Sequence, residues 1–320
     1  EAGNFGMRAS IRQLSAAALA ACLAWAGFWA GPALGAGTFK PFVAAAPAGN
    51  TTEEAVKNVK AKLKQGKFEI VGEDSPYTDG SLRVIGVTNA DLKRAASQHG
   101  TGGFGAVMRV GVTSNKGVIE VSYTNPSPIG VAYNIGDLSR VEQALAAALG
   151  GSEQFGSKGL SQQKLARYHY MATMPGFKDA KKVASFNSHA AAVSAIEKAM
   201  KQPDSDISAI WQVKVNADQT LFGVRLDGGP WRGQMKGIMD KIDIATPKSS
   251  AALPWEILVS GKDVYYLPGK YRIALMFPDL TMQQFLKISN VPDMMERSAE
   301  ELVTLAGAKI EKKREGFSVD

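Results

Sequence analysis

The 320-residue chain has almost no cysteine and little histidine. Its single cysteine is Cys22, and its three histidines are His99, His169 and His189. The chain after Cys22 therefore has no thiol for a disulfide, a thiolate nucleophile or a cysteine-ligated metal. Catalytic patterns are also missing, because no G-x-S-x-G elbow and no paired catalytic carboxylates are present in the sequence. We expect no cofactor and no metal.

A long apolar run occurs only near the N-terminus, where it is flanked like a signal peptide. Two arginines precede an uncharged stretch over residues 14–30, and a proline follows before the small residues 33–36. This order is typical of a secretory signal peptide, predicted over residues 7–36. We therefore expect a periplasmic or secreted protein with no transmembrane segment after the signal. Residues 1–6 are expected to be an extension outside the fold.

An alternative N-terminus remains open at Cys22. Residues 19–22 read Leu-Ala-Ala-Cys, which matches a lipoprotein cleavage box and would leave the protein anchored at Cys22. Residues 23–30 would then begin the mature chain, and they are apolar and aromatic. Lipoproteins usually begin with a polar tether, so the sequence favours the ordinary signal peptide.

Charge of one sign is not concentrated in the chain. The net charge is +7, and the charged and apolar fractions of 21% and 45% are those of a globular protein. The densest basic cluster, residues 309–314, lies in a charged tail expected over residues 307–320, where Glu311 and Glu315 dilute it. Because nucleic-acid binding usually needs a basic patch, we expect a small molecule or a periplasmic protein as the partner instead.

Residues 51–150 predict a first α+β unit. Thr51 and Glu54 have the spacing of a capping box, and Asn89 is placed to cap a second helix. Strand-forming runs separated by turn residues lie between and after these helices. The expected helices cover residues 52–65, 91–98 and 138–149, and the expected strands cover residues 68–71, 82–87, 106–112, 118–123 and 130–134.

Residues 187–306 predict a second unit with the same order of elements. Ser188 opens a helix, a later helix carries an apolar face from Trp231 to Ile242, and a last helix follows Asp279. The expected strands cover residues 209–215, 220–226, 255–259, 264–267 and 271–277. Near the end of each unit the match is residue by residue, because Tyr123 aligns with Tyr265, Pro126 with Pro268 and Asp137 with Asp279.

These patterns predict an α+β protein of two tandem repeats. Each repeat has the order helix, two strands, helix, three strands, helix. Strands joined by short turns pair antiparallel, and we expect the helices to pack on one face of each sheet.

The first unit resembles a bacterial family known as domain of unknown function 302. The resemblance rests on Glu-Glu-Ala-Val at residues 53–56, the strand at 82–87 with the helix after it, and the hairpin end Val-Ser-Tyr-Thr-Asn-Pro at 121–126. It implies a fold similar to the TATA-binding-protein-like or helix-grip folds, here in a duplicated, exported form. The family has no established activity, so the resemblance implies no catalytic residues.

Residues 151–186 join the two units and have no counterpart in the repeat. Ser161 is expected to cap a helix that runs on to residue 171. The candidate ligand-binding residues lie at its end and just beyond: Tyr168, His169, Tyr170, Met171 and Met174. A plain linker would be polar and rich in glycine and serine, so these aromatic residues and methionines indicate a specific role.

Two roles for residues 151–186 are open. The segment is either a clamp that packs the two units together or a small-ligand site, and His169 with two methionines would suit copper(I) in the second case. A glycine-rich run at residues 100–105 is expected to be a flexible turn, because it runs from helix to strand and not from strand to helix. Asp137 and Asp279 each precede a helix and are expected to act as N-caps.

The function predicted from sequence is a non-enzymatic small-ligand-binding or interaction protein of the periplasm. One alternative is a hydrolase-type enzyme that uses His169 as general base, and another is a scaffold protein without a pocket. A dry apolar cavity lined by methionines and aromatic residues would favour the binding protein. A large exposed apolar patch without a cavity would favour the scaffold.

Overall fold

The computed structural model describes residues 38–151, 153–168, 176 and 179–310. The expected extension, signal peptide, lipidation site, four candidate site residues and most of the charged tail lie outside the described residues: 1–6, 7–36, Cys22, His169, Tyr170, Met171, Met174 and 311–320. We call residues 38–155 the first half and residues 179–310 the second half. No helix in these described ranges is both long and apolar enough to cross a membrane.

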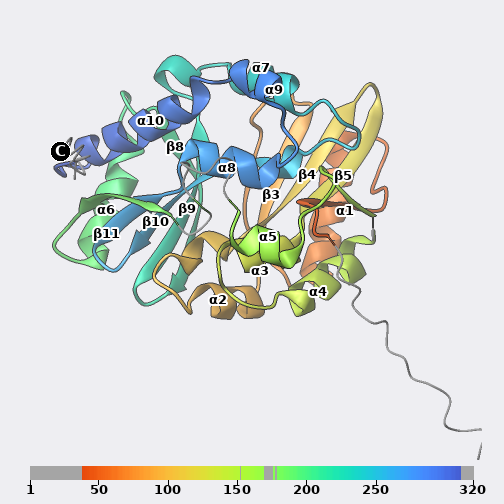
Figure 1. The fold of residues 1–320 in the computed structure, drawn as a ribbon, viewed down its shortest axis with the longest axis horizontal. Helices are drawn as coiled ribbons and strands as arrows, with labels where there is room; N and C mark the ends of the chain where they lie inside the picture. The colour runs from red at the N-terminus through yellow and green to blue at the C-terminus, as the bar shows by residue number, and fades with distance from the viewer. Residues whose placement is uncertain (1–37, 152, 169–175, 177–178, 311–320) are drawn as a thin grey trace, which may run out of the picture. The chain divides into compact units, whose positions relative to one another are not determined.

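Two antiparallel sheets with helices around them form the fold, which confirms the predicted α+β class (Figure 1). The first sheet has six strands in the order β2-β3-β4-β5-β1-β6, and the second has five in the order β7-β11-β10-β9-β8. The strands of the first sheet are β1 (Phe42–Ala44), β2 (Glu69–Asp74), β3 (Leu82–Thr88), β4 (Met108–Asn115), β5 (Val118–Thr124) and β6 (Glu153–Phe155). Those of the second sheet are β7 (Lys181–Ser185), β8 (Ile207–Asn216), β9 (Gln219–Leu226), β10 (Trp255–Ser260) and β11 (Asp263–Tyr266).

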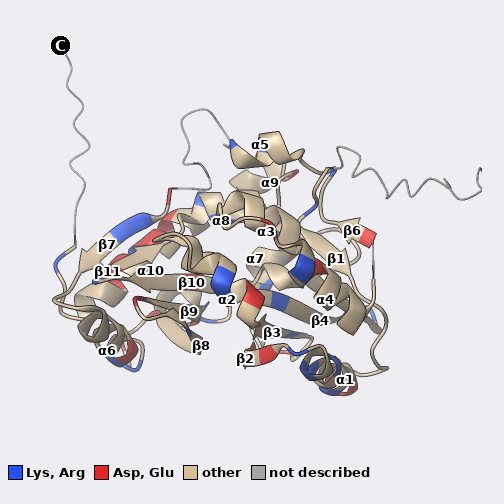
Figure 2. Ribbon diagram, turned by 90° about the horizontal axis from the view of Figure 1, so that it is seen from below, with Lys and Arg blue, Asp and Glu red and all other residues tan. Residues whose placement is uncertain are grey.

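In the first half, helices α1 (Thr52–Gln65) and α4 (Ser139–Leu149) contact each other, and α1 also contacts β3, β4 and β5. Helix α1 begins as predicted, because Thr51 Oγ1 accepts a hydrogen bond from the Glu54 amide at 3.1 Å. Its apolar positions are buried, whereas charged residues of both signs lie along its length (Figure 2). Tertiary burial of this apolar face stabilises the helix more than its propensity does.

In the second half, α6 (His189–Ala199) and α10 (Val291–Leu305) contact each other as α1 and α4 do. Helix α6 contacts β10 and β11, and α10 contacts β7 and β8. Ser188 Oγ accepts from the Ala191 amide at 3.1 Å, so the predicted N-cap of α6 is confirmed. Each half therefore has a pair of helices in mutual contact, of which α1 in the first half and both α6 and α10 in the second contact the strands of the sheet.

The strands predicted at residues 130–134 and 271–277 are wrong, because both segments are helical. They belong to α3 (Pro126–Ala132) and α8 (Gly269–Met276). Strand β5 already pairs with β4 and β1, and β11 already pairs with β10 and β7. Because β5 and β11 are each paired on both sides, a strand that followed either of them could not pair with it. The chain forms a helix after each of these strands instead. Pro126 suits this start, because proline lacks an N–H that the first turn would leave unpaired.

Strands β1 and β7 precede the ranges 51–150 and 187–306 in which we expected the two units, yet they complete the two sheets. With them, the order of strands is β2-β3-β4-β5-β1 in the first half and β8-β9-β10-β11-β7 in the second. Tyr123 lies in β5 and Tyr265 in β11, which hold the same place in these two orders. These five strands are therefore arranged in the same order in both sheets.

Each half packs one short 3₁₀ helix against the sheet of the other half. The 3₁₀ helix η1 (Gly102–Gly105) of the first half contacts β9 and β10, and η3 (Ser250–Ala252) of the second half contacts β3, β4 and β5. A Cβ atom on Gly103 would lie 2.6 Å from Leu258 Cδ1, so a side chain there would prevent this approach. Residues 102–105 of the glycine-rich run predicted to be a flexible turn are thus buried, because they pack against the second sheet.

Trp211 of β8 fills the contact between the two sheets. Strand β2 lies beside β8, and the indole of Trp211 packs on glycines of β2, β3 and β9. A Cβ atom on Gly223 would lie 2.0 Å from Trp211 Cε2, and one on Gly72 would lie 2.8 Å from Trp211 Cβ. The missing side chains of these glycines make room for the largest side chain in the contact.

Candidate functional site

The segment predicted to hold the site is only partly described, and Tyr168 is its one candidate residue in view. Helix α5 (Gln162–Ala166) begins after Ser161 as predicted but ends before Tyr168, so the helix expected to reach residue 171 is shorter. The helix is also largely exposed, because Leu165 alone among its residues is buried. A five-residue helix presents one apolar position to its neighbours.

The segment nevertheless contacts both halves. The Tyr168 hydroxyl donates to the Pro278 carbonyl at 3.4 Å, and the Lys158 amide donates to Asp279 Oδ2 at 2.6 Å. Leu165 packs near the first residues of α3 and the last residues of α8. Asp279 therefore holds this segment, and Thr281 caps α9 (Met282–Leu286) in its place. The N-cap predicted at Asp137 is also wrong, because Leu138 holds that position; Asp137 accepts instead from the amide of Ser139, the first residue of α4, at 2.8 Å.

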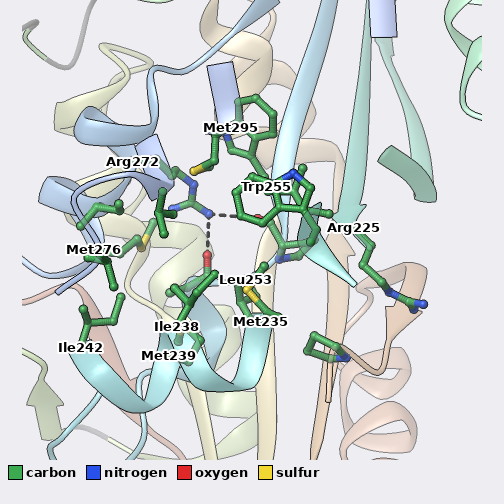
Figure 3. Close-up of a pocket in the computed structure, with 18 of the residues that line it drawn as sticks. Arg225, Met235, Ile238, Met239, Ile242, Leu253, Trp255, Arg272, Met276 and Met295 are labelled. Carbon is green, nitrogen blue, oxygen red and sulfur yellow. Dashed lines mark hydrogen bonds between the residues drawn. The ribbon is translucent and has the colours of Figure 1, made fainter. Parts of the chain in front are cut away.

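A larger apolar pocket lies in the second half, where sequence analysis had predicted no site. It is bounded by α7 (Met235–Ile242), α8, α10 and the ends of β9 and β10. The space between its atoms is ≈ 740 Å³, including the opening to solvent. Figure 3 shows its side chains converging from these elements, which are far apart in the sequence.

Four methionines line this pocket. Met235 and Met239 come from α7, Met276 from α8 and Met295 from α10 (Figure 3). Ile238, Ile242 and Leu253 add branched aliphatic side chains. Unbranched thioether side chains change rotamer easily and adapt to ligands of different outline. We call this group of residues the methionine pocket.

Two tryptophans in the lining have their polar N–H groups paired elsewhere. Trp231 Nε1 donates to Ser298 Oγ at 2.8 Å, and Ser298 in turn donates to Asp206 at 3.0 Å. Trp255 Nε1 donates to the Leu267 carbonyl at 3.2 Å. The indole rings therefore present apolar surface to the pocket. Trp231, which was predicted to lie on an apolar helix face, is buried and also lines the pocket.

Arg272 is the buried charge of the methionine pocket. It lies in α8 with 4% of its surface exposed, and Figure 3 shows its guanidinium among Met276, Met295 and Leu253. Its Nη2 donates to the Ala252 carbonyl at 2.9 Å and to the Pro254 carbonyl at 3.3 Å. These bonds hold the guanidinium in place but supply no negative charge.

A second arginine and one glutamate complete a buried charged cluster. Arg109 of β4 donates from Nη1 to Glu256 Oε1 of β10 at 2.5 Å and from Nε to the Ala251 carbonyl at 3.0 Å. Arg272 Nε lies 3.7 Å from Glu256 Oε2, which is too far for a hydrogen bond. Burial, followed by the charge of Arg272, lowers the pKa of Arg109 to about 10. One carboxylate thus faces two cations.

The lining of the pocket includes a second ion pair. Asp74 of β2 is buried, and Arg225 of β9 donates to it from Nε at 2.6 Å. Burial raises the pKa of Asp74 in spite of this arginine. Because each group neutralises the other, this pair adds no net charge to the pocket. It also brings the first half to the edge of the site.

A more polar cavity lies on another side of the charged cluster. Its lining includes His99, Tyr133 and Asn134 of the first half and Leu267 of the second. Burial raises the pKa of Tyr133 to about 12, and Arg272, Glu256 and Arg109 are the charges that act on it. The phenol is therefore neutral at physiological pH and unsuited to act as a base.

The described residues hold no group of three or more histidine, cysteine or acidic side chains that could bind a metal. No family model matches the chain, and no curated protein or solved structure matches it in comparison. What the site can hold therefore follows from its geometry. That geometry offers apolar enclosure and one buried cation, which are features of a binding site.

Sequence analysis missed the methionine pocket for two reasons. The face of α7 was recognised as apolar, but an apolar helix face is usually packed against the core. Arg272 was placed in a strand, where its neighbours could not be inferred. The one available signal was the pair Met235 and Met239 on a short helix that also holds Ile238.

Proposed function

We propose that the protein is an exported, non-enzymatic binding protein that takes a small, mostly apolar molecule into the methionine pocket. The observation that supports this proposal is the lining itself, in which four methionines and two tryptophans surround a single buried cation. Enclosed apolar walls with few polar groups are typical of small-molecule sites. Export, to the periplasm or outside the cell, is supported by the signal-peptide pattern of residues 7–36.

The hydrolase alternative has less support. His169, its proposed general base, lies outside the described residues. The other two histidines do not line the methionine pocket. His99 lines the polar cavity, and His189 forms hydrogen bonds with Gly261 and Thr220. Asp74, the carboxylate in the pocket lining, is buried and accepts a hydrogen bond from Arg225, so this oxygen is already engaged and is not free to take a proton from a substrate. The presence of the methionine pocket, which is partly open to solvent, argues against a scaffold without a pocket.

We further propose that the two halves arose by duplication. Equal strand order, a pair of helices in mutual contact in each half and the reciprocal contacts of η1 and η3 support this origin. The likeness to domain of unknown function 302, and with it a TATA-binding-protein-like or helix-grip-like fold, stays a prediction from the residues of the first unit. N-terminal sequencing of exported protein tests the remaining part, with a first residue expected between Gly35 and Thr38.

Binding of a neutral apolar probe tests the pocket directly. N-phenyl-1-naphthylamine is uncharged at neutral pH and fluoresces in apolar surroundings, so it should be retained by the wild-type protein. Met235→Trp should abolish retention, because the larger side chain occupies the pocket while Met235 itself is only half-buried. Val118→Trp, at an exposed position of β5, is the matched control and should bind as the wild type does.

Retention of the probe by both variants would contradict the assignment of the site. Absence of probe binding in the wild type would contradict the proposed function. Native mass spectrometry of the exported protein gives a second readout, since a co-purifying small molecule should be present in the wild type and missing from Met235→Trp.

A further inference from the structure

The charged cluster beside the methionine pocket has an excess of positive charge. Arg109, Arg272 and Glu256 are all at most 4% exposed, so solvent screens them weakly. Glu256 gives one oxygen to Arg109 at 2.5 Å, and its other oxygen has no hydrogen-bond partner among the described residues. Two guanidinium groups and one carboxylate leave one positive charge uncompensated.

Arg272 is the more weakly paired of the two cations, because its Nε lies 3.7 Å from Glu256 Oε2, whereas Arg109 Nη1 lies 2.5 Å from Glu256 Oε1. Its Nε and Nη1 have no hydrogen-bond partner among the described residues, although both atoms are shielded from solvent. Unpaired charged donors in an interior are costly and are found mainly where a ligand, ion or water completes them. The neighbouring ionisable groups do not supply the missing anion: Tyr133 is neutral, and Asp74 is engaged by Arg225.

Arg272 lines the methionine pocket, so a molecule that enters the pocket reaches this cation. An apolar body would contact Met235, Met239, Met276 and Met295 around it (Figure 3). A neutral ligand would cover Arg272 without pairing it, which would make the buried charge more costly. An anionic group on the ligand would pair it instead, in a charge-assisted hydrogen bond.

A singly charged anion suits the site better than a doubly charged one. Arg272 is the one uncompensated cation among the described pocket residues, and the rest of the lining is largely apolar. A phosphate monoester would bring a second negative charge into these surroundings without a partner, at a large desolvation cost. A carboxylate carries one charge and matches the planar fork of a guanidinium.

We infer that the ligand of the methionine pocket is a small amphipathic carboxylic acid, whose carboxylate pairs with Arg272 while its hydrocarbon part lies among the methionines. This inference rests on the proposed function, because it names the ligand class of the same pocket. It also explains why a buried arginine is held by two carbonyls in walls that are otherwise apolar.

Octanoate and octanol test the inference as a matched pair, because they share a chain and differ in charge. Each is titrated against bound N-phenyl-1-naphthylamine at pH 7. Octanoate should displace the probe at a concentration about tenfold or more below that of octanol, as expected for a hydrogen bond to a charged group. The advantage should fall as the pH is lowered through the pKa of octanoic acid, because the protonated acid no longer pairs with Arg272.

Arg272→Met removes the charge and keeps much of the length and apolar bulk of the side chain. Octanoate should lose its advantage in this variant, whereas octanol should bind as before or better. Lys236→Met is the matched control, because Lys236 is an exposed cation of α7 that does not line the pocket. It should keep the preference for octanoate, which separates pairing at Arg272 from the general positive charge of the protein.

The outcomes separate this inference from the proposed function. Equal displacement by octanoate and octanol in the wild type, with the probe bound, overturns the carboxylate and leaves the pocket intact. A probe that does not bind at all overturns the proposed function itself. A preference for octanoate that persists in folded Arg272→Met also overturns the inference. If Arg272→Met does not fold, the wild-type pair and its pH dependence decide the question without it.

Discussion

Helices α2 (Ala90–Ala96) and α7 hold the same place in the two halves but leave different amounts of space. Each follows the third strand of its half along the chain, β3 or β9, and each contacts the other half, since α2 contacts β8 and Lys236 of α7 lies over the Tyr77 ring. Helix α2 buries Leu92, Ala95 and Ala96, whose short side chains allow a close approach. Helix α7 presents methionines and isoleucines to a pocket. The same chain order can thus give a closed contact or a hollow one.

The connection before each helix contributes to this difference. Asn89 follows β3 directly and caps α2 by accepting from the Leu92 amide at 2.8 Å. Residues 227–234 separate β9 from α7 and include the short 3₁₀ helix η2 (Gly229–Trp231). This connection places Trp231 in the wall of the pocket. Side-chain size on the helix and the length of the preceding loop together decide whether the space is filled.

The largest loss of stability is expected from Glu256→Gln, which removes the only carboxylate from the charged cluster beside the methionine pocket. Two buried arginines would then face each other without a negative charge, and breaking such a pair costs about 3–5 kcal/mol of unfolding free energy. Urea denaturation at pH 7 measures this loss. Glu153→Gln, at an exposed position of β6, is the control and should change stability by less than about 0.5 kcal/mol. Similar stability of the two variants would contradict the charged cluster.

A pH-dependent effect of intermediate size is expected at the C-terminal end of α7. Asp243 ends α7, and its carboxylate accepts from the Ser249 amide at 3.0 and 2.9 Å. Burial, which outweighs these bonds and the charge of Lys248, raises the pKa of Asp243 from 3.8 to about 6. The folded state then binds the proton more tightly than the unfolded state. The contribution of Asp243 to stability is therefore greatest below pH 3.8 and is lost as the pH rises through about 6.

Comparison of the wild type with Asp243→Asn isolates this contribution. The unfolding free energy of the wild type should fall relative to that of Asp243→Asn by about 2 kcal/mol between pH 4 and pH 7. Urea denaturation of both proteins at several pH values gives the difference curve. A difference that does not change with pH would show that Asp243 titrates normally and that the end of α7 is open to water.

The smallest effect is expected when α2 is made to resemble α7. Ala96 is fully buried, so Ala96→Met should overpack the contact and cost about 1–3 kcal/mol. Met235→Leu, which faces the space of the methionine pocket, should cost less than about 1 kcal/mol. Guanidinium denaturation of the two variants measures the contrast. An equal cost at both positions would mean that α7 is packed as tightly as α2.

Local signals predicted much of the secondary structure. The caps at Thr51, Asn89 and Ser188 and the hairpins β4–β5 and β8–β9 were predicted from sequence and are confirmed. A cap needs only a side-chain oxygen and an amide three residues away, so its chemistry is visible in a short window. The strands expected after β5 and β11 were wrong because β1 and β7 already occupy the neighbouring edges, and no short window contains that information.

The candidate site was much less accessible to prediction. Its lining runs from Asp74 to Met295, and Arg272 meets Glu256 and Arg109 only after both halves have folded. Sequence analysis placed the site instead in residues 151–186, where aromatic residues and methionines are dense in the chain. A high density of aromatic residues and methionines in a segment describes only its composition. A pocket depends on which side chains come together in the folded structure.

The sequence by itself determined the α+β class, the starts of helices and the pairing of adjacent strands, because these depend on periodicity and hydrogen bonds between residues that are close in the chain. Only the tertiary structure decided that η1 is buried, that Trp211 packs on three glycines and that α7 borders a pocket while α2 does not. These outcomes depend on which surfaces meet. Packing is set by the shapes and charges of distant side chains in contact, and no local pattern contains them.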